Sequence, residues 1–330
     1  MERDYIGVDL HKAFFQVATV TGEGTLAWEA RFPRTAAGLQ GFLARCSPAS
    51  EVAVEASGPT WTFADQVCPH VGKLVVVDPS RTRLKAGYAA KTDRLDARRL
   101  ADALRRESVV RVYYPPPAIR ELRELCRYRV SLARTRARVK QRVRALLLRT
   151  GSPDVTATDL AGVRGQQELA ALSVAGWAGR SLTGWQDLLQ TLTRLVAAVQ
   201  TDVERVALAD PIVTALRAIP GVGPVLGLVI RAEIGCITRF ARADQLACYA
   251  GVVPRVHQSG NRCYYGRTIK QGSPWLRWAL IEAAIHGPKR RDETGRWARR
   301  LSLQKGALKA RVAIARALCD EVFVTWRQVG

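Results

Sequence analysis

The first third of the chain alternates between short apolar runs and polar breaks, which is typical of strands joined by turns. Residues 5–9 (YIGVD) and 14–20 (FFQVATV) are predicted as strands, and 25–32 follows as a third strand after a glycine-containing turn at Thr21–Gly24. Three short strands joined by tight turns predict an antiparallel meander.

The elements that follow the meander change the picture from an all-β to a mixed α/β domain. The pattern predicts, in order, a helix over 35–46, a buried strand over 51–56, a helix over 60–71, a strand over 73–79 and a helix over 92–106. Thr92 is a candidate N-cap for the last helix. The order is that of an RNase H-like domain. The actin-like ATPases share it, and the pattern alone does not separate the two.

Two heptad runs follow, after the Pro-Pro-Pro boundary at 115–117. Residues 119–149 are predicted as one long helix, and a second long helix follows a Gly/Ser/Thr-containing segment at 151–184. The seven-residue rows are Leu125, Leu132, Val139 and Leu146 in the first helix, and Trp185, Leu192, Val199 and Val206 in the second. They predict a coiled-coil helical hairpin that pairs with itself or with a second chain. An ordinary helical core is the alternative.

The last region opens on IPGVGPVLGLVIRAEIG at 219–235, a Pro-Gly-x-Gly turn between two apolar segments. This pattern predicts a helix-hairpin-helix in which the backbone near Gly221 and Gly223 and the next helix N-terminus face a phosphate. A glycine-rich turn without a ligand is the alternative. The predicted domains are therefore 1–114, 115–210 and 211–330, with an α/β first domain, a helical middle and a mainly helical end.

The charge balance points to a polyanionic partner. The 330 residues carry 51 Lys+Arg against 29 Asp+Glu, a formal net charge of +22. The excess lies mainly in 106–150 and 211–330, while the first hundred residues are nearly neutral. Such a field favours nucleic acid.

The seven cysteines form no Cys-x-x-Cys pair, which argues against a zinc site. The sequence shows no signal peptide or long apolar run, so we expect a cytoplasmic location and no membrane partner.

Candidate chemistry lies in KTDRLDARRL at 91–100. Asp93 and Asp96 are three residues apart, so they share one face of the predicted helix. An isolated pair of this kind is usually a solvated helix face. Asp9 and Glu55 change the interpretation, because each ends a strand and the two strands neighbour each other in an RNase H-like sheet. The acidic helix packs beside those strands in such a domain, so all four carboxylates are expected to converge.

Four converging carboxylates need a cation to offset their repulsion. Oxygen-only ligands suit Mg²⁺ or Mn²⁺, and two such ions can hold the attacking and leaving oxygens of a phosphodiester. The pattern therefore favours a phosphoryl-transfer site.

Several motifs resemble the DEDD transposases of bacterial insertion sequences, a family that includes the Piv-type DNA invertases and the RNA-bridge-guided recombinases. The N-terminal motifs are YIGVDLHK, VAVEASGP, VVVDPSRTR and KTDRLDARRLA. The C-terminal ones are IPGVGPVLG, LACYAGVVPRVHQSG and IKQGSPWLRWALIEAA. The resemblance covers nearly the whole chain. It implies a RuvC-like domain, a coiled-coil middle and a C-terminal domain that supplies a nucleophilic serine.

The family's functional residues fall on named positions of this chain. Its metal-binding acids fall on Asp9, Glu55, Asp93 and Asp96, and its serine falls on Ser259 of QSGN. The family often has Asn where this chain has Ser273, so Ser273 is a second candidate nucleophile. Candidate nucleic-acid contacts, from the basic stretches and the glycine turn, are Arg134, Arg138, Arg142, Gly221, Gly223, Arg255, Arg262, Arg267 and Lys270.

The sequence thus predicts a DNA transposase that forms a covalent serine–DNA intermediate. The resemblance further implies double-stranded DNA partners, a structured guide RNA and a homotetramer, in a bacterial, nucleoid-associated setting. The main rival is a RuvC-like nuclease that cleaves branched DNA with metal-activated water. An actin-like ATPase would need glycine-rich phosphate loops, which GVDLHKAF lacks. A non-enzymatic nucleic-acid scaffold would need none of the acids.

Overall fold

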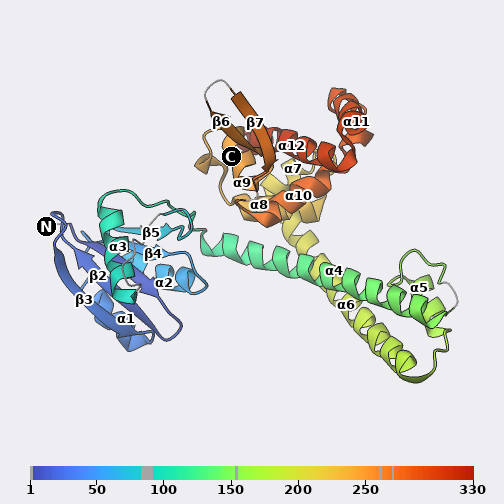
Figure 1. The fold of residues 1–330 in the computed structure, drawn as a ribbon, viewed down its shortest axis with the longest axis horizontal. Helices are drawn as coiled ribbons and strands as arrows, with labels where there is room; N and C mark the ends of the chain where they lie inside the picture. Colours follow the sequence, from blue (N-terminus) through green and yellow to red (C-terminus); the bar gives the residue numbers. More distant parts are fainter. Residues whose placement is uncertain (1–2, 83–91, 153–154, 260–261, 270) are drawn as a thin grey trace. The chain divides into compact units, whose positions relative to one another are not determined.

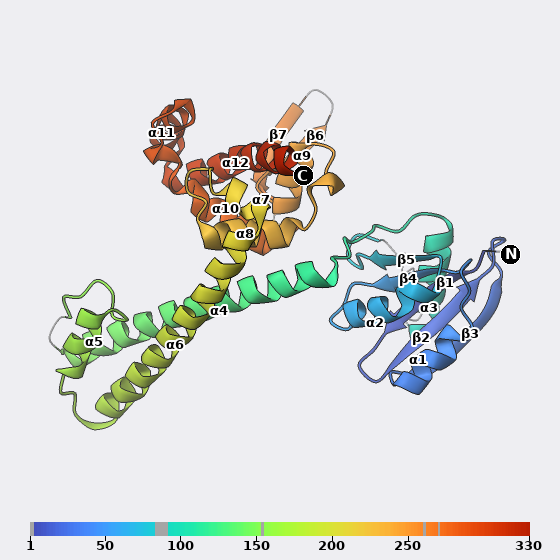
Figure 2. The ribbon, with the colours of Figure 1, turned by 180° about the vertical axis from the view of Figure 1, so that it is seen from behind.

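The computed structural model describes residues 3–82, 92–152, 155–259, 262–269 and 271–330. The chain divides into two compact units, one ending at Tyr114 and the other beginning at Pro115 (Figures 1 and 2). The predicted boundary at 114 falls at this division. The further boundary predicted at residue 210 stays a prediction.

The first unit is built on a five-stranded mixed sheet with the order β3-β2-β1-β4-β5. The β1–β2 and β2–β3 pairs are antiparallel, and the β1–β4 and β4–β5 pairs are parallel. The meander and the later strands were therefore predicted correctly. The strands are β1 (Tyr5–Leu10), β2 (Phe14–Val20), β3 (Leu26–Pro33), β4 (Glu51–Glu55) and β5 (Lys73–Val77).

Helices cover both faces of this sheet, and the alternation within each strand decides which side chain meets which helix. On one face Val52 and Val54 pack with side chains of α1 (Ala36–Leu43) and α2 (Thr60–Val67). On the other face Ala53 packs against Leu100 and Leu104 of α3 (Asp93–Arg105). The first unit is thus a helix–sheet–helix sandwich.

A close approach between β1 and α3 depends on one glycine. Gly7 lies between Ile6 and Val8, which face α1 and α2, so it faces α3. A Cβ atom at Gly7 would lie 2.1 Å from the carbonyl oxygen of Ala97, too near for any side chain. The absence of a side chain at Gly7 therefore lets α3 lie directly on β1.

The second unit begins with two long helices that pack on each other, α4 (Pro117–Thr150) and α6 (Gly176–Ala209), with short α5 (Val163–Ala170) between them. Val139 and Leu146 of the first predicted row are buried against Leu192 of the second, within one chain. The predicted helical hairpin is correct. Because the partner helix in the same chain covers much of the apolar row, self-association through these helices stays a prediction.

The remaining elements form one helical core with a small hairpin. Buried side chains of α8, α10 and α12 meet at its centre, in a cluster that includes Leu228, Leu280 and Leu318. None of the helices in the described part of the chain combines the length and apolar character needed to cross a membrane. The elements are α7 (Pro211–Leu216), α8 (Pro224–Ile234), η2 (Ile237–Arg239), α9 (Ala243–Ala250), β6 (Pro254–Ser259), β7 (Arg262–Thr268), α10 (Pro274–Ala284), η3 (Gly287–Lys289), α11 (Glu293–Lys305) and α12 (Ala307–Val329).

Candidate active site

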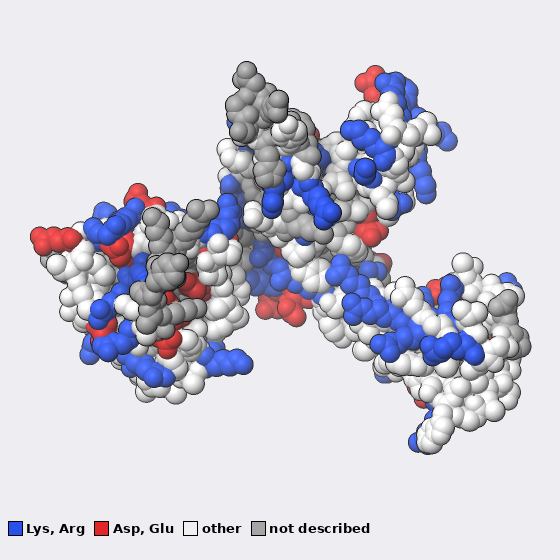
Figure 3. All heavy atoms as spheres, viewed as in Figure 1, with Lys and Arg blue, Asp and Glu red and all other residues white. Residues whose placement is uncertain are grey.

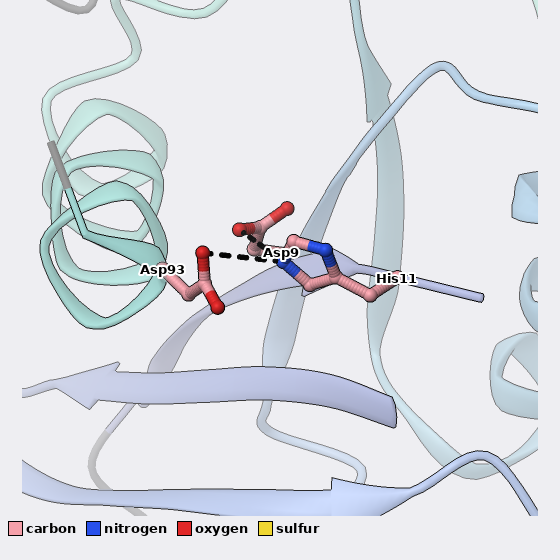
Figure 4. Close-up of side chains that lie close together, drawn as sticks. All are labelled: Asp9, His11 and Asp93. Carbon is pink, nitrogen blue, oxygen red and sulfur yellow. Dashed lines mark hydrogen bonds and ion pairs between the residues drawn. The ribbon is translucent and has the colours of Figure 1, made fainter. Parts of the chain in front are cut away.

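Two of the predicted acids meet at the end of β1. The ligand atoms of Asp9, His11 and Asp93 all lie within 4.8 Å of one another (Figure 4). Nε2 of His11 is 3.1 Å from Oδ2 of Asp9 and 3.4 Å from Oδ1 of Asp93. The side chains are partly open to solvent, with exposed fractions of 22% for Asp9 and 48% for Asp93. Their donors are therefore within reach of an ion and of a substrate.

Local structure explains why the acids of α3 lie next to β1. Thr92 has extended backbone angles and its side chain accepts a hydrogen bond from the backbone N–H of Leu95, so the helix begins at Asp93. Acidic side chains are favourable in a first turn because the unpaired N–H groups there carry partial positive charge. The contact at Gly7 then brings this turn against the strand that carries Asp9.

The positive charge around the Asp9 carboxylate is too small to offset its burial and the repulsion from neighbouring acids. Burial raises the pKa of the Asp9 carboxyl, His11 opposes that shift, and the negative charges of Asp93 and Asp96 add to it. A bound cation would reverse this balance by favouring the ionised carboxylate. The donor set and its charge therefore fit a divalent metal.

Asp96 and Glu55 lie close to this group without being part of it as the side chains stand. Asp96 acts on the charge of Asp9 and has Arg99 at 3.4 Å. Glu55 ends β4, one residue beyond Val54, which is paired in register with Val8 of β1. Asp9 and Glu55 therefore occupy equivalent positions on adjacent parallel strands.

A polar hollow of about 420 Å³ opens beside Asp93. It is lined by Gln16, Glu29, Ala30, Arg31, Thr92, Asp93 and Arg94. Glu29 forms ion pairs with both Arg94 and Arg98, which neutralises part of the positive charge there. Arg31 stacks its guanidinium on the ring of Phe14, 3.4 Å from the ring centre. The hollow is thus a charged surface next to the candidate metal ligands.

The two candidate serines have different settings in the second unit. Ser259 is the last residue of β6, where it pairs in register with Arg262, and its side chain lies outside the described residues. The Ser273 side chain is 8% exposed and accepts a hydrogen bond from Leu276 as the N-cap of α10. Its hydroxyl donates to Oε2 of Glu233 at 2.9 Å. The Ser273 hydroxyl is therefore committed to internal hydrogen bonds.

Most of the predicted nucleic-acid contacts lie on the solvent side of the second unit. Basic side chains gather along α4 (Figure 3). The exposed arginines are Arg134, Arg138 and Arg142 of α4, with Arg255 and Arg267 in the β6–β7 hairpin. Arg134 also stacks near Trp275 and Trp278, with its guanidinium 4.9 and 5.5 Å from the ring centres. The side chain of Arg262 and the whole of Lys270 lie outside the described residues.

The two glycines of the predicted helix-hairpin-helix turn differ in role. Gly221 has φ +95°, and a Cβ atom there would lie 2.5 Å from the carbonyl oxygen of Ala283 in α10. This position is required for packing inside the unit. Gly223 is the N-cap of α8, and nothing lies within 4 Å of a Cβ placed on it. Of the two, only Gly223 leaves room for a phosphate beside the backbone.

Sequence reasoning missed two residues of the N-terminal site, His11 and Gly7. His11 stands two positions after Asp9 in GVDLHK, and a histidine so close to a strand-end acid was a usable signal. Gly7 stands between the apolar residues Ile6 and Val8 in β1, so the sequence shows that it faces the opposite side of the strand from them. The sequence pattern does not show that α3 lies against that side.

Comparison with known proteins places the chain in a class. Residues 6–151 match a DEDD transposase model of the IS110 group, described as a transposase, and residues 213–302 match a second model. The description of that second model is the transposase IS116/IS110/IS902 family. The two regions together make up more than two thirds of the chain. The chain belongs to this transposase family.

Similar proteins extend over almost the same length. A probable family 20 transposase of Pseudomonas aeruginosa is 27% identical, over 96% of this chain and 94% of its own. The transposase for insertion sequence element IS1111A of Coxiella burnetii is 28% identical, over 94% of this chain and 86% of its own. A pilin gene-inverting protein of Moraxella lacunata is 24% identical, over 96% of this chain and 92% of its own.

Proposed function

We propose that the chain is a metal-dependent DNA recombinase that moves an insertion element, and that its first unit is an RNase H-like domain of the RuvC type. The observation that carries the proposal is the convergence of Asp9 and Asp93 from β1 and α3 in a member of a transposase family. The mixed strand order supports the RNase H-like assignment, because the antiparallel meander continues into two parallel strands.

The metal would be held by Asp9 and Asp93, with Asp96 and Glu55 completing the set from the same helix turn and the adjacent strand end. Bound Mg²⁺ or Mn²⁺ would offset the charge that develops on the phosphate and on the departing oxygen. The raised pKa of Asp9 supports this role, because an unneutralised carboxylate at a half-buried position is costly without a cation.

The nucleophile in this proposal is Ser259, from the second unit. Its hydroxyl oxygen would form a bond to the phosphorus of a DNA phosphodiester, and the bond from phosphorus to the departing sugar oxygen would break. The serine would lose its proton to solvent, and the departing oxygen would take one up. The alternative nucleophile, Ser273, is less suitable because its hydroxyl caps α10 and donates to buried Glu233.

The partners follow from charge and from the family. A formal charge of +22 and the exposed arginines of α4 support binding of double-stranded DNA and of a structured guide RNA. A protein named for pilin gene inversion among the relatives supports strand exchange on DNA. The two helices α4 and α6 offer a surface for assembly into a homotetramer, in which a serine and a metal site from different protomers could meet.

The test is a labelled DNA substrate carrying the element ends, incubated with the protein and its co-purified nucleic acid, then run on a denaturing gel. We expect a labelled protein band with the unmodified protein and with Ser273→Ala, but none with Ser259→Ala. A band that is lost only with Ser273→Ala would move the nucleophile to Ser273. Normal cleavage with no covalent band from any variant would favour the metal-dependent nuclease.

A further inference from the structure

His11 is the member of the site that an oxygen-only metal centre does not need. It lies in the turn between β1 and β2, which is closed by a hydrogen bond of 2.9 Å from the backbone N–H of His11 to the carbonyl oxygen of Phe14. The imidazole stacks on the ring of Phe14, with ring centres 4.5 Å apart and an angle of 22° between the planes. The stacking thereby fixes the plane of the imidazole ring.

Phe14 has a second partner, because Arg31 of β3 lies over its ring, 3.4 Å from the ring centre. Phe14 is thus in contact with both His11 and Arg31, and tilting the imidazole out of its plane would give up its stacking on Phe14. In this plane Nε2 lies toward Asp9 and Asp93 (Figure 4).

The distances from Nε2 of His11 to the two carboxylates are close to the distance between neighbouring ligands of one metal ion. Two neighbouring ligands of an octahedral ion at about 2.1 Å lie about 3.0 Å apart. Nε2 of His11 is 3.1 Å from a carboxylate oxygen of Asp9 and 3.4 Å from one of Asp93. Two of the three distances between ligand atoms are therefore near the spacing that a shared ion requires, and the third, between the two carboxylates, is no more than 4.8 Å.

We propose that His11 is a direct nitrogen ligand of the ion held by Asp9 and Asp93, and that it shifts the preference of the site from Mg²⁺ toward Mn²⁺. The inference rests on the proposed metal site and adds the identity of its ion. Mg²⁺ favours carboxylate and water oxygens, and Mn²⁺ also takes oxygen ligands, but as a first-row transition ion Mn²⁺ accepts an imidazole nitrogen more readily than Mg²⁺ does. A mixed nitrogen and oxygen set therefore gains more affinity for Mn²⁺ than for Mg²⁺.

A rival role for His11 has the same contacts but no metal bond. The imidazole would then only donate a hydrogen bond to Asp9 and so orient that carboxylate. Both roles predict weaker metal binding when His11 is replaced, so affinity alone does not separate them. A direct bond differs in one observable, the magnetic coupling between the unpaired electrons of Mn²⁺ and the ligand nitrogen.

The experiment uses the full chain loaded with Mn²⁺ and studied by pulsed electron paramagnetic resonance. We expect coupling to one directly bound ¹⁴N in the unmodified protein, and its loss in His11→Gln. His70→Gln, an exposed histidine of the same unit, is the matched control and keeps the signal. Titrations should show Mn²⁺ affinity falling in His11→Gln by more than the roughly 10- to 100-fold typical for loss of an outer-shell partner, with a much smaller change for Mg²⁺ in competition.

The outcomes separate this inference from the proposed function. Bound Mn²⁺ without nitrogen coupling in the unmodified protein would overturn the role of His11 as a ligand and leave the carboxylate site intact. Equal losses of Mn²⁺ and Mg²⁺ affinity in His11→Gln would overturn the shift in preference. If the protein binds no Mn²⁺, or binds it equally well without Asp9, the proposed metal site itself is refuted.

Discussion

Each of the two units holds a carboxylate away from bulk water, but the two carboxylates are neutralised in different ways. In the second unit the Glu233 side chain is 2% exposed, and Arg127 binds both of its oxygens at 2.9 and 3.1 Å. Ser273 donates a further hydrogen bond to it. In the first unit the Asp9 side chain is 22% exposed and has one partially compensating neighbour, His11, and two acids that repel it.

We interpret Glu233 as a structural charge and propose that Asp9 is a functional one. Glu233 joins α4, α8 and α10, because Arg127 comes from the first of these helices and Ser273 begins the last. Its charge is satisfied inside the protein. The charge of Asp9 is offset only in part, by His11, and burial raises the pKa of its carboxyl. Perturbed carboxylates of the second kind mark reactive sites, whereas fully paired ones mark packing.

The largest expected effect concerns Asp9. Asp9→Asn should abolish strand cleavage and weaken Mn²⁺ binding, because the variant removes a ligand, while the unit stays folded. Since burial raises the pKa of Asp9, its ionisation opposes folding above the ordinary carboxyl pKa, and that opposition grows until the pH exceeds the raised pKa and is constant above it. Without metal, the Asn variant should therefore be at least as stable as the unmodified protein at neutral pH, as measured by urea unfolding.

The matched control for this prediction is Asp102→Asn. Asp102 lies on the same helix α3 but pairs with Arg105 and Arg106, so its loss should leave cleavage and metal binding unchanged. Full cleavage by Asp9→Asn would show that Asp9 is not a functional carboxylate.

A second effect is expected at Glu233, on stability and not on the metal site. Glu233→Ala leaves Arg127 without its buried partner, and because the Arg127 side chain is 38% exposed and can reach solvent, the loss of unfolding free energy should be below the ~3–5 kcal/mol typical of a fully buried pair. Hydrogen exchange should rise in peptides from α4, α8 and α10, while peptides of the first unit and its Mn²⁺ affinity stay unchanged. Unchanged exchange together with lost cleavage would make Glu233 a functional carboxylate.

The smallest effect is expected at Ser273. Ser273→Ala removes the N-cap of α10 and a hydrogen bond to Glu233, and loss of such a cap costs about 1–2 kcal/mol. Ser273→Asn should recover most of this, since Asn also caps helices, and both variants should still form the covalent DNA product. Chemical unfolding of the unmodified protein, Ser273→Ala and Ser273→Asn measures their unfolding free energies and checks that Ser273→Ala is the least stable. A Ser273→Asn protein that is stable but forms no covalent product would contradict the structural role.

Much of the first unit could be predicted from the sequence because its signals are local. Alternating apolar residues predicted the strands, and Thr92 with Asp93 predicted the start of α3. The expected strand order placed the strand ends of Asp9 and Glu55 side by side, and the acidic helix was expected beside them. The part of Gly7 in that contact could not be predicted, because it depends on which element Gly7 faces, and that is known only once the sheet has formed.

The two serines show the same limit in the second unit. In the sequence, Ser259 and Ser273 are both polar residues beside a glycine, and neither stands in a local His/Asp arrangement that marks a nucleophile, although His257 is two residues before Ser259. Only the fold shows that Ser273 meets Glu233, forty positions away in the sequence. The role of a hydroxyl depends on its partners, and long-range partners leave no mark on local sequence pattern.

The sequence by itself determined the secondary structure of the first unit, the heptad rows, the basic character of the chain and the acids from which a metal site could be built. Periodicity and charge are properties of neighbouring residues, so they can be read without a fold. Only the tertiary structure decided that His11 completes the group with Asp9 and Asp93, that Gly221 is needed for packing, and that α4 and α6 bury much of their apolar rows within one chain. These outcomes depend on distances between residues far apart in sequence, which the packing of β1, α3 and the long helices sets.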